Sequence, residues 1–205
     1  MITLNNLNDL LKSFFDLKIV TQNHKIVFYP PLKENISIDD KTIINIYLFD
    51  IRENLEAKAN KWELTRDKTR TYREKPPVLL DLFYMITIYG ASSNIESKIE
   101  EELQILSYLL PIIYNKNHLT QEDVGSEFTS LFKQLDKNSP KIPIESIHPK
   151  FLDEQGGFQI WSAFEQHLKP AIYLKLTAPI LFDAVDMGTI VLEKSMNLNP
   201  KGDCD

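Results

Sequence analysis

The sequence predicts an α+β fold in which a single, mostly antiparallel or mixed β-sheet is covered by helices. Two long apolar runs, at residues 42–51 and 76–90, carry this prediction, because alternating β-branched and aromatic residues are typical of central strands. Amphipathic helical patterns precede and follow these runs, and this order of elements favours helices that cover one sheet. A long charged arm at residues 52–75 separates the two central strands.

The first elements are a helix and a short strand. Residues 2–17 place five large apolar side chains on one side of a helix: Leu4, Leu7, Leu11, Phe14 and Phe15. Residues 25–29 form a short strand that ends at two prolines, which cannot donate a hydrogen bond to a sheet. A polar loop at residues 33–40 leads to the first central strand.

The second central strand is followed by two helical patterns. Ser93 and Glu96 form a predicted capping box that opens a helix. Five residues of this helix share a stripe that we expect to be buried: Ile95, Ile99, Leu103, Leu106 and Leu110. Pro111 is expected to end or kink it. Thr120 opens a second predicted helix that runs to about Leu135 and buries four apolar residues: Val124, Phe128, Leu131 and Phe132.

The C-terminal part contains three predicted strands and one helix. The strands span residues 142–147, 171–180 and 188–194. The helix carries an apolar stripe in which Trp161 is expected to belong to the core, and it ends at Pro170; the stripe comprises Phe158, Trp161, Phe164 and Leu168. We expect residues 1–195 to form a single domain with the arm inserted at 52–75, and residues 196–205 to form a flexible tail.

Composition excludes several classes of protein. The 205 residues carry a net charge of −6, which argues against a nucleic-acid binder. A single cysteine, Cys204, cannot form a disulfide framework or a thiolate metal cluster. No apolar run reaches the length of a transmembrane helix, and the N-terminal residues lack the pattern of a signal peptide. We therefore expect a protein that is made and folded in the cytoplasm, without membrane insertion.

The residues that usually carry chemistry do not converge in the sequence. The histidines lack metal-ligand spacing and favour isolated surface positions: His24, His118, His148 and His167. Phosphate-binding loops and nucleophile elbows are also absent. The sequence therefore predicts no catalytic residue, no metal, no cofactor and no enzymatic activity.

The charged arm is the best candidate for a functional segment. Residues 52–75 have a net charge of about +3, in contrast to the acidic remainder, and they include Trp62 and Tyr72. The pattern allows either a short helix at residues 53–62 or a protruding β-ribbon at 65–72. Because arginine and tryptophan are enriched in protein interfaces, a protein-binding arm fits better than a nucleic-acid grip.

The two central runs resemble the cap, or tail-terminator, family of contractile injection systems. Five features carry the resemblance: the leucine-rich first helix, the triplet Arg52-Glu53-Asn54, Pro76-Pro77 before a strand with Tyr84 and Thr87, the helix that ends near Pro111, and Trp161 before Tyr173. They cover residues 2–180. The resemblance implies a structural subunit of a phage-tail-like particle with an inner tube and a contractile sheath.

The function implied by the resemblance is mechanical. Such proteins form a closed, six-fold ring on the distal end of tube and sheath, which stops polymerisation and joins the two. The implied partners are other copies of the chain, the inner tube and sheath proteins, and a second cap protein in some particles. Assembly in the cytoplasm is implied, for a particle that is either released or membrane-anchored. The alternative is a transient assembly chaperone or adaptor for sheath or tube proteins.

The expected contacts with these partners fall on two regions. The strand at residues 171–180 is expected near a sheet edge, where Leu174 and Leu176 would receive an arm of the sheath. The triplet and the arm supply the remaining expected interface residues: Arg52, Glu53, Asn54, Trp62, Arg66, Arg70, Tyr72 and Arg73. Of these, Arg66, Arg70 and Arg73 are expected to bind an acidic surface of the tube, the sheath or a neighbouring subunit.

Overall fold

The computed structural model shows two compact units in this chain. The residues that it describes are 2–19, 23–32, 40–56, 62–66, 70–135, 140–147, 161–164, 168–181 and 185–189. The main unit is built from Met1–Lys58 and Val78–Ile180, and the small unit from Ala59–Pro77 and Leu181–Asp205. The predicted tail at residues 196–205 lies outside the described residues.

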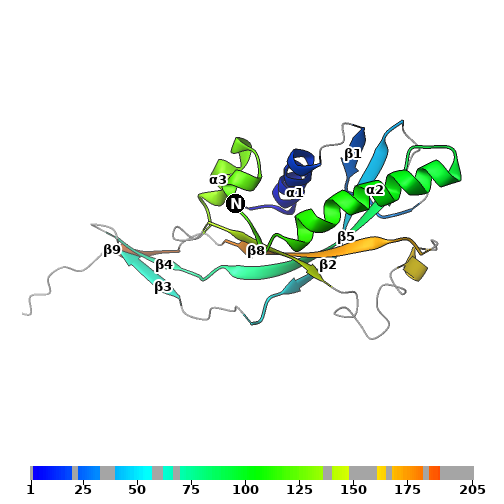
Figure 1. Cartoon of the computed structure of the whole chain (residues 1–205). Helices are drawn as coiled ribbons and strands as arrows, with labels where there is room; N and C mark the ends of the chain where they lie inside the picture. The colour runs from blue at the N-terminus through cyan, green and yellow to red at the C-terminus, as the bar shows by residue number, and fades with distance from the viewer. Residues whose placement is uncertain are drawn as a thin grey trace, which may run out of the picture. The chain divides into compact units, whose positions relative to one another are not determined.

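The main unit contains one mixed sheet of six strands, as the sequence predicts (Figure 1). In spatial order the strands are β1 (His24–Val27), β2 (Thr42–Glu53), β5 (Val78–Tyr89), β8 (Ala171–Ile180), β7 (Ile142–Ile147) and β6 (His118–Leu119). Strands β1 and β2 are parallel, and every other neighbouring pair is antiparallel. The two long apolar runs form the adjacent strands β2 and β5, which confirms their prediction as central strands.

Helices cover one face of this sheet (Figure 1). They are α1 (Leu4–Lys18), α2 (Ile95–Tyr114) and the single turn α3 (Thr129–Phe132). The main core lies between them and the sheet face that carries Tyr84, Ile86 and Leu174. The buried hydroxyl of Tyr84 donates to Oδ1 of Asn8 on α1 (3.1 Å), and burial raises the pKa of this tyrosine well above its usual range.

Helix α1 forms where its stripe predicts it. The Thr3 hydroxyl accepts the N–H of Asn6 (3.2 Å), and the Asn6 side chain accepts the N–H of Thr3 (3.1 Å), so two backbone donors at the helix start are satisfied. The helix buries five apolar side chains: Leu7, Leu10, Leu11, Phe14 and Phe15. Leu4 was expected in this stripe but is 42% exposed, because it lies in the first turn.

Two helix boundaries differ from the prediction. Asn94, and not Ser93, caps α2: its Oδ1 accepts the backbone N–H groups of Glu96 (2.8 Å) and Ser97 (3.4 Å). Pro111 lies inside α2, which continues to Tyr114. Proline removes one backbone donor, and this loss near the C-terminal end does not stop the helix.

The helix expected from Thr120 to Leu135 is broken. It comprises two 3₁₀ turns, η2 (Gln121–Asp123) and η3 (Ser126–Phe128), and then α3. The Asp123 carboxylate accepts both the backbone N–H and the hydroxyl of Thr120, and Val124 is extended (φ −132°, ψ 171°), so the backbone cannot continue as a helix. The four apolar residues predicted to be buried are nevertheless in the core: Val124, Phe128, Leu131 and Phe132.

A second, smaller apolar cluster lies on the opposite face of the sheet. It is centred on Met85, Trp161 and Tyr173. Trp161 is 2% exposed, which confirms its prediction as a core residue. Leu168, predicted on the same stripe, is 70% exposed because residues 168–170 are not helical, and Phe158 lies outside the described residues.

The small unit contains a separate three-stranded antiparallel sheet. Its order is β3 (Glu63–Arg66), β4 (Arg70–Glu74) and β9 (Val185–Thr189). The β-ribbon alternative for the arm is therefore correct for β3 and β4. The helix alternative at 53–62 is not seen at residues 53–56 and 62, and the other half of that range, residues 57–61, is not described. The last strand begins at Val185, earlier than the expected 188–194, and residues 190–194 lie outside the described residues.

Candidate assembly surfaces

The triplet at the end of β2 is built into the sheet. Arg52 Nε donates to Oδ2 of Asp50 (2.6 Å), and the Arg52 guanidinium carbon lies 5.3 Å from the centre of the Phe83 ring. Asn54 Nδ2 donates to both carboxylate oxygens of Asp81 (3.1 and 3.2 Å). Arg52 and Asn54 thus both have partners within the main unit, while the Arg52 side chain remains 50% exposed.

The Asp81 carboxylate holds Asn54 of the triplet at the end of β2. The same carboxylate accepts a hydrogen bond from Asn54 and a short one from the Thr177 hydroxyl of β8 (2.6 Å). The backbone N–H of Asn54 also donates to the Leu79 carbonyl (2.8 Å), which extends the β2–β5 pairing by one residue. This carboxylate therefore ties the ends of three adjacent strands together. Glu53, which lies between Arg52 and Asn54 in the sequence, is exposed.

The prediction that β8 lies near a sheet edge is wrong. Strand β8 pairs with β5 along its length, and with β7 from Tyr173 to Leu176. Leu174 and Leu176 are both 0% exposed and belong to the main core. Their alternating pattern reflects burial under the helices, so neither side chain can contact a sheath protein directly.

The small sheet gathers the arm residues around Arg73. The Arg73 guanidinium carbon lies 4.2 Å from the centre of the Trp62 ring. Arg73 stands opposite Leu64 on β3 and opposite Val185 on β9. Residues directly opposite in neighbouring strands point to the same face of a sheet. We call this surface, formed by Trp62, Leu64, Arg73 and Val185, the Arg73 face.

The Arg73 face is exposed and largely apolar. The exposed fractions are 39% for Trp62, 64% for Leu64 and 52% for Val185. Tyr72 alternates to the opposite face and is half-buried. Arg66 and Arg70 lie on β3 and β4, but their side chains are outside the described part of the structure. Sequence reasoning identified the arginines and Trp62, and missed Leu64 and Val185.

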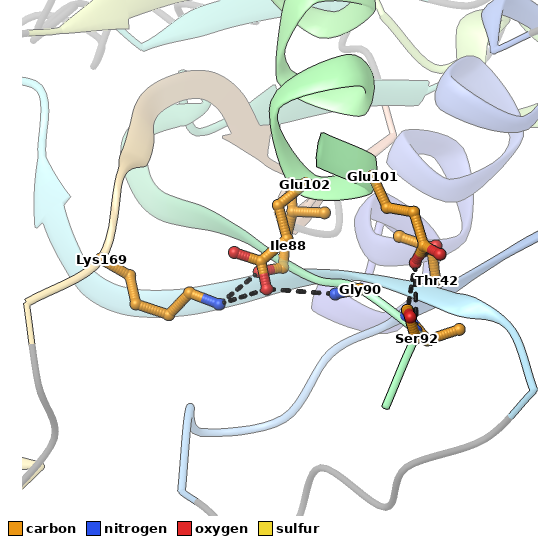
Figure 2. A network of polar contacts seen from close by, with 8 residues as sticks. Thr42, Ile88, Gly90, Ser92, Glu101, Glu102 and Lys169 are labelled. Atoms are coloured by element: carbon orange, nitrogen blue, oxygen red, sulfur yellow. Dashed lines mark hydrogen bonds and ion pairs between the residues drawn. The ribbon is translucent and has the colours of Figure 1, made fainter. Parts of the chain in front are cut away.

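A polar junction fixes the N-terminal half of α2 to the end of β5 (Figure 2). Glu101 Oε2 accepts the backbone N–H groups of Ala91 (2.7 Å) and Ser92 (3.3 Å). Glu102 Oε1 accepts the N–H of Gly90 (3.1 Å) and the Lys169 ammonium (2.8 Å).

Lys169 and Gly90 complete this junction. The Lys169 ammonium also donates to the Ile88 carbonyl (2.9 Å; Figure 2). It lies 4.3 Å from the centre of the Tyr89 ring. At Gly90 any side chain would meet the helix, because an added Cβ would be 2.6 Å from the Lys98 carbonyl oxygen. These contacts determine which side of α2 faces the sheet.

Helix α2 consequently has two apolar sides. One side is buried and comprises Ile105, Leu106, Leu109 and Ile113. The stripe that the sequence predicted to be buried instead faces solvent, apart from Leu106. Its exposed fractions are 74% for Ile95, 49% for Ile99, 52% for Leu103 and 41% for Leu110, and it continues to Tyr114 at 68%. We call these five residues the α2 stripe.

A second clamp holds the far end of α2. The Asp123 carboxylate is 2.5 Å from the Lys116 ammonium and 3.9 Å from that of Lys18 at the end of α1. Burial alone would raise the pKa of this carboxyl. Hydrogen bonds from Lys116 and Thr120 and the positive charge of Lys116 outweigh this effect of burial. The pKa of Asp123 is therefore lower than usual.

The described residues show no candidate metal-binding group. None of their histidine, cysteine, aspartate and glutamate side chains form a group of three that could hold a metal ion. His24 pairs with Asp16 (3.2 Å), and His148 and His167 lie outside the described residues. The described helices include none with the length and hydropathy needed to cross a membrane.

Two solved structures have a similar fold. One is the sheath/tube terminator of the extracellular contractile injection system PVC in its extended state, with a TM-score of 0.67 and 17% identity over 100% of this chain and 66% of that chain. The other is the tube-terminating cap of the anti-feeding prophage, with a TM-score of 0.67 and 16% identity over 96% of this chain and 62% of that chain. This chain thus spans slightly less than two thirds of the length of either relative. No curated protein matches the sequence.

A comparison of the sequence with protein families gives a match over most of the chain. The family described as the Pvc16 N-terminal domain matches residues 4–191. This range includes both central strands, the helices and all three strands of the small sheet. The chain therefore belongs to the Pvc16 N-terminal domain family.

Proposed function

We propose that this protein is a structural cap, or terminator, of a contractile injection particle. In this role its copies form a closed ring of six at the distal end of the inner tube and sheath. The ring stops polymerisation and joins tube to sheath. The observation that supports the proposal is the likeness in fold to two proteins described as a sheath/tube terminator and a tube-terminating cap, over 100% and 96% of this chain.

The surfaces of the molecule fit a role in protein assembly. The Arg73 face and the α2 stripe are two exposed apolar surfaces on different elements. Exposed apolar patches on soluble proteins commonly mark protein–protein contacts. A protein with two different contact surfaces can bind a neighbour on each side, as a ring requires.

The arginines of the arm supply the charged part of this proposal. Arg66, Arg70 and Arg73 would bind an acidic surface of the tube, the sheath or a neighbouring subunit. Charge reversal at these positions should weaken the contact, and so should added salt, because exposed charge pairs are screened. Binding that is insensitive to both treatments would contradict this part of the proposal.

The proposal makes the protein a non-enzyme and places it in an extracellular particle after assembly in the cytoplasm. Its proposed partners are other copies of the chain, the tube and sheath proteins and, in some particles, a second cap protein. Nucleic acid and direct membrane insertion have no role in it.

Mass photometry of the purified protein, alone and with its tube and sheath proteins, tests the proposal. We expect a closed ring, either free or on the ends of short capped polymers. Omission of the protein should give tubes of uncontrolled length. A stable monomer that assists assembly but leaves finished polymers would instead indicate a transient chaperone.

A further inference from the structure

The α2 stripe is an apolar surface that the fold of a single chain leaves exposed. Ile99, Leu103, Leu110 and Tyr114 follow one another at intervals of four, seven and four residues, which keeps them on one side of the helix. Single exposed apolar residues are common, but a line of five large ones next to the already buried side of the same helix is not. A helix that is apolar on two sides is expected to be covered on both.

The border of the stripe defines the chemistry of its partner. Glu96 and Glu100 are exposed beside Ile95, Ile99 and Leu103 on the N-terminal half of the helix. A partner surface should therefore combine apolar side chains with a positive charge.

The Arg73 face has these properties. It offers three exposed apolar side chains, Trp62, Leu64 and Val185, around one guanidinium group. Arginine stacked on tryptophan is pre-organised, so it loses little conformational freedom on binding a carboxylate. Tryptophan and arginine are also the residues most enriched at the energetic centres of interfaces.

We propose that the α2 stripe of one copy binds the Arg73 face of a neighbouring copy. In this contact Arg73 pairs with Glu100, while Leu64 and Val185 cover Ile99 and Leu103. The two surfaces differ, so the contact is head-to-tail, and a series of such contacts closes into a ring where the rotation permits. A contact between two α2 stripes would instead give a two-fold dimer. The inference rests on the proposed function and specifies how the ring is joined.

Disulfide cross-linking between copies tests the contact directly. In a Cys204→Ser background, Leu103→Cys and Leu64→Cys are purified separately, mixed and oxidised, both free and on tubes. Disulfides between the two variants can form only between copies. The matched control replaces Leu103→Cys by Leu17→Cys, which lies on α1 and is 63% exposed. We expect the 103–64 product to exceed the 17–64 product about tenfold, because the proposed contact raises the local concentration of the two thiols.

Four results would overturn the inference. A 103–64 yield no higher than the control while wild-type rings still form would remove this contact and leave the proposed function intact. Preferential 103–103 products would indicate a two-fold dimer. In a separate Leu103→Cys chain that keeps the native Cys204, an intramolecular disulfide between these two cysteines would show that the chain's own C-terminal segment covers the stripe. Absence of wild-type rings and of tube-bound protein would reject the proposed function as well.

A charge exchange gives an independent measurement. Arg73→Glu and Glu100→Arg should each weaken self-association about tenfold, and the double variant should recover most of that loss, because the pair is restored with reversed polarity. Recovery is read from the subunit concentration at which rings form. If the loss of self-association in the double variant equals the product of the losses in the two single variants, Arg73 and Glu100 do not face each other.

Discussion

The two sides of α2 have nearly the same composition but different surroundings. Leu109 is 0% exposed against the sheet, and the next residue, Leu110, is 41% exposed on the α2 stripe. The junction at Glu101 and Glu102 and the clamp at Asp123 hold the helix in this orientation. Burial on one side stabilises the monomer, and exposure on the other leaves apolar area for an assembly contact. An apolar stripe therefore predicts a partner surface, but it does not show whether that partner surface belongs to the same chain.

The largest effect on stability is expected for a substitution on the buried side of α2. Leu109→Ala should lower the free energy of unfolding by about 2–5 kcal/mol, since it removes buried methyl groups and leaves a cavity. Chemical denaturation of the monomer measures this loss. The matched control, Leu110→Ala, removes the same atoms from the exposed side and should change the free energy by less than about 0.5 kcal/mol. Equal effects for the two variants would contradict the orientation of α2.

The clamp at Asp123 should have the next largest effect. Asp123→Asn should cost about 1–3 kcal/mol at pH 7, because the buried hydrogen bonds of a carboxylate are lost. The folded pKa of Asp123 is lower than its ordinary value of 3.8. Its stabilisation is therefore complete above that value and disappears as the pH falls through the folded pKa.

Denaturation of wild type and Asp123→Asn at pH 7 and between pH 4 and about pH 2 measures this dependence. The difference in unfolding free energy should shrink at the acidic end. A difference that stays constant down to the lowest pH would show that the charge of Asp123 contributes nothing.

A smaller effect is expected at the polar junction. Lys169→Met removes the donor to the Glu102 carboxylate and to the Ile88 carbonyl, and we expect a loss of about 1–2 kcal/mol. Lys133→Met, at an exposed position on the turn after α3, is the control and should be close to neutral. Thermal unfolding compares the two variants. A neutral Lys169→Met would mean that the contacts of Lys169 do not contribute to holding α2 on the sheet.

The smallest effect on stability is expected on the α2 stripe itself. Ile99→Ser should change the unfolding free energy by less than about 0.5 kcal/mol, because Ile99 is 49% exposed. Ring formation should nevertheless weaken, since the proposed contact loses an apolar side chain. Leu17→Ser on α1 is the control for a general loss of surface hydrophobicity. If both variants form rings as wild type does, the stripe is not part of the ring contact.

Most strands of the main sheet can be predicted from the residue pattern alone. The alternation at residues 42–51, 78–89, 142–147 and 171–180 identified four strands within a few residues, because side chains on a half-buried strand must alternate between two environments. The stripe at Leu7 to Phe15 identified α1 for the equivalent reason at helical period. Local pattern and burial agree in these elements.

The order of the strands and the orientation of α2 depend on tertiary contacts. Residue pattern cannot show that β7 pairs with β8, which is why the strand of Leu174 and Leu176 was wrongly expected near a sheet edge. Residue pattern also cannot show which of the two apolar sides of α2 is buried, because apolar residues recur at the helical period on both. The choice depends on contacts between residues distant in the sequence, such as Lys169 with Glu102 and Lys18 with Asp123. The Arg73 face likewise exists only because β9, more than 110 residues after β4, brings Val185 beside Arg73.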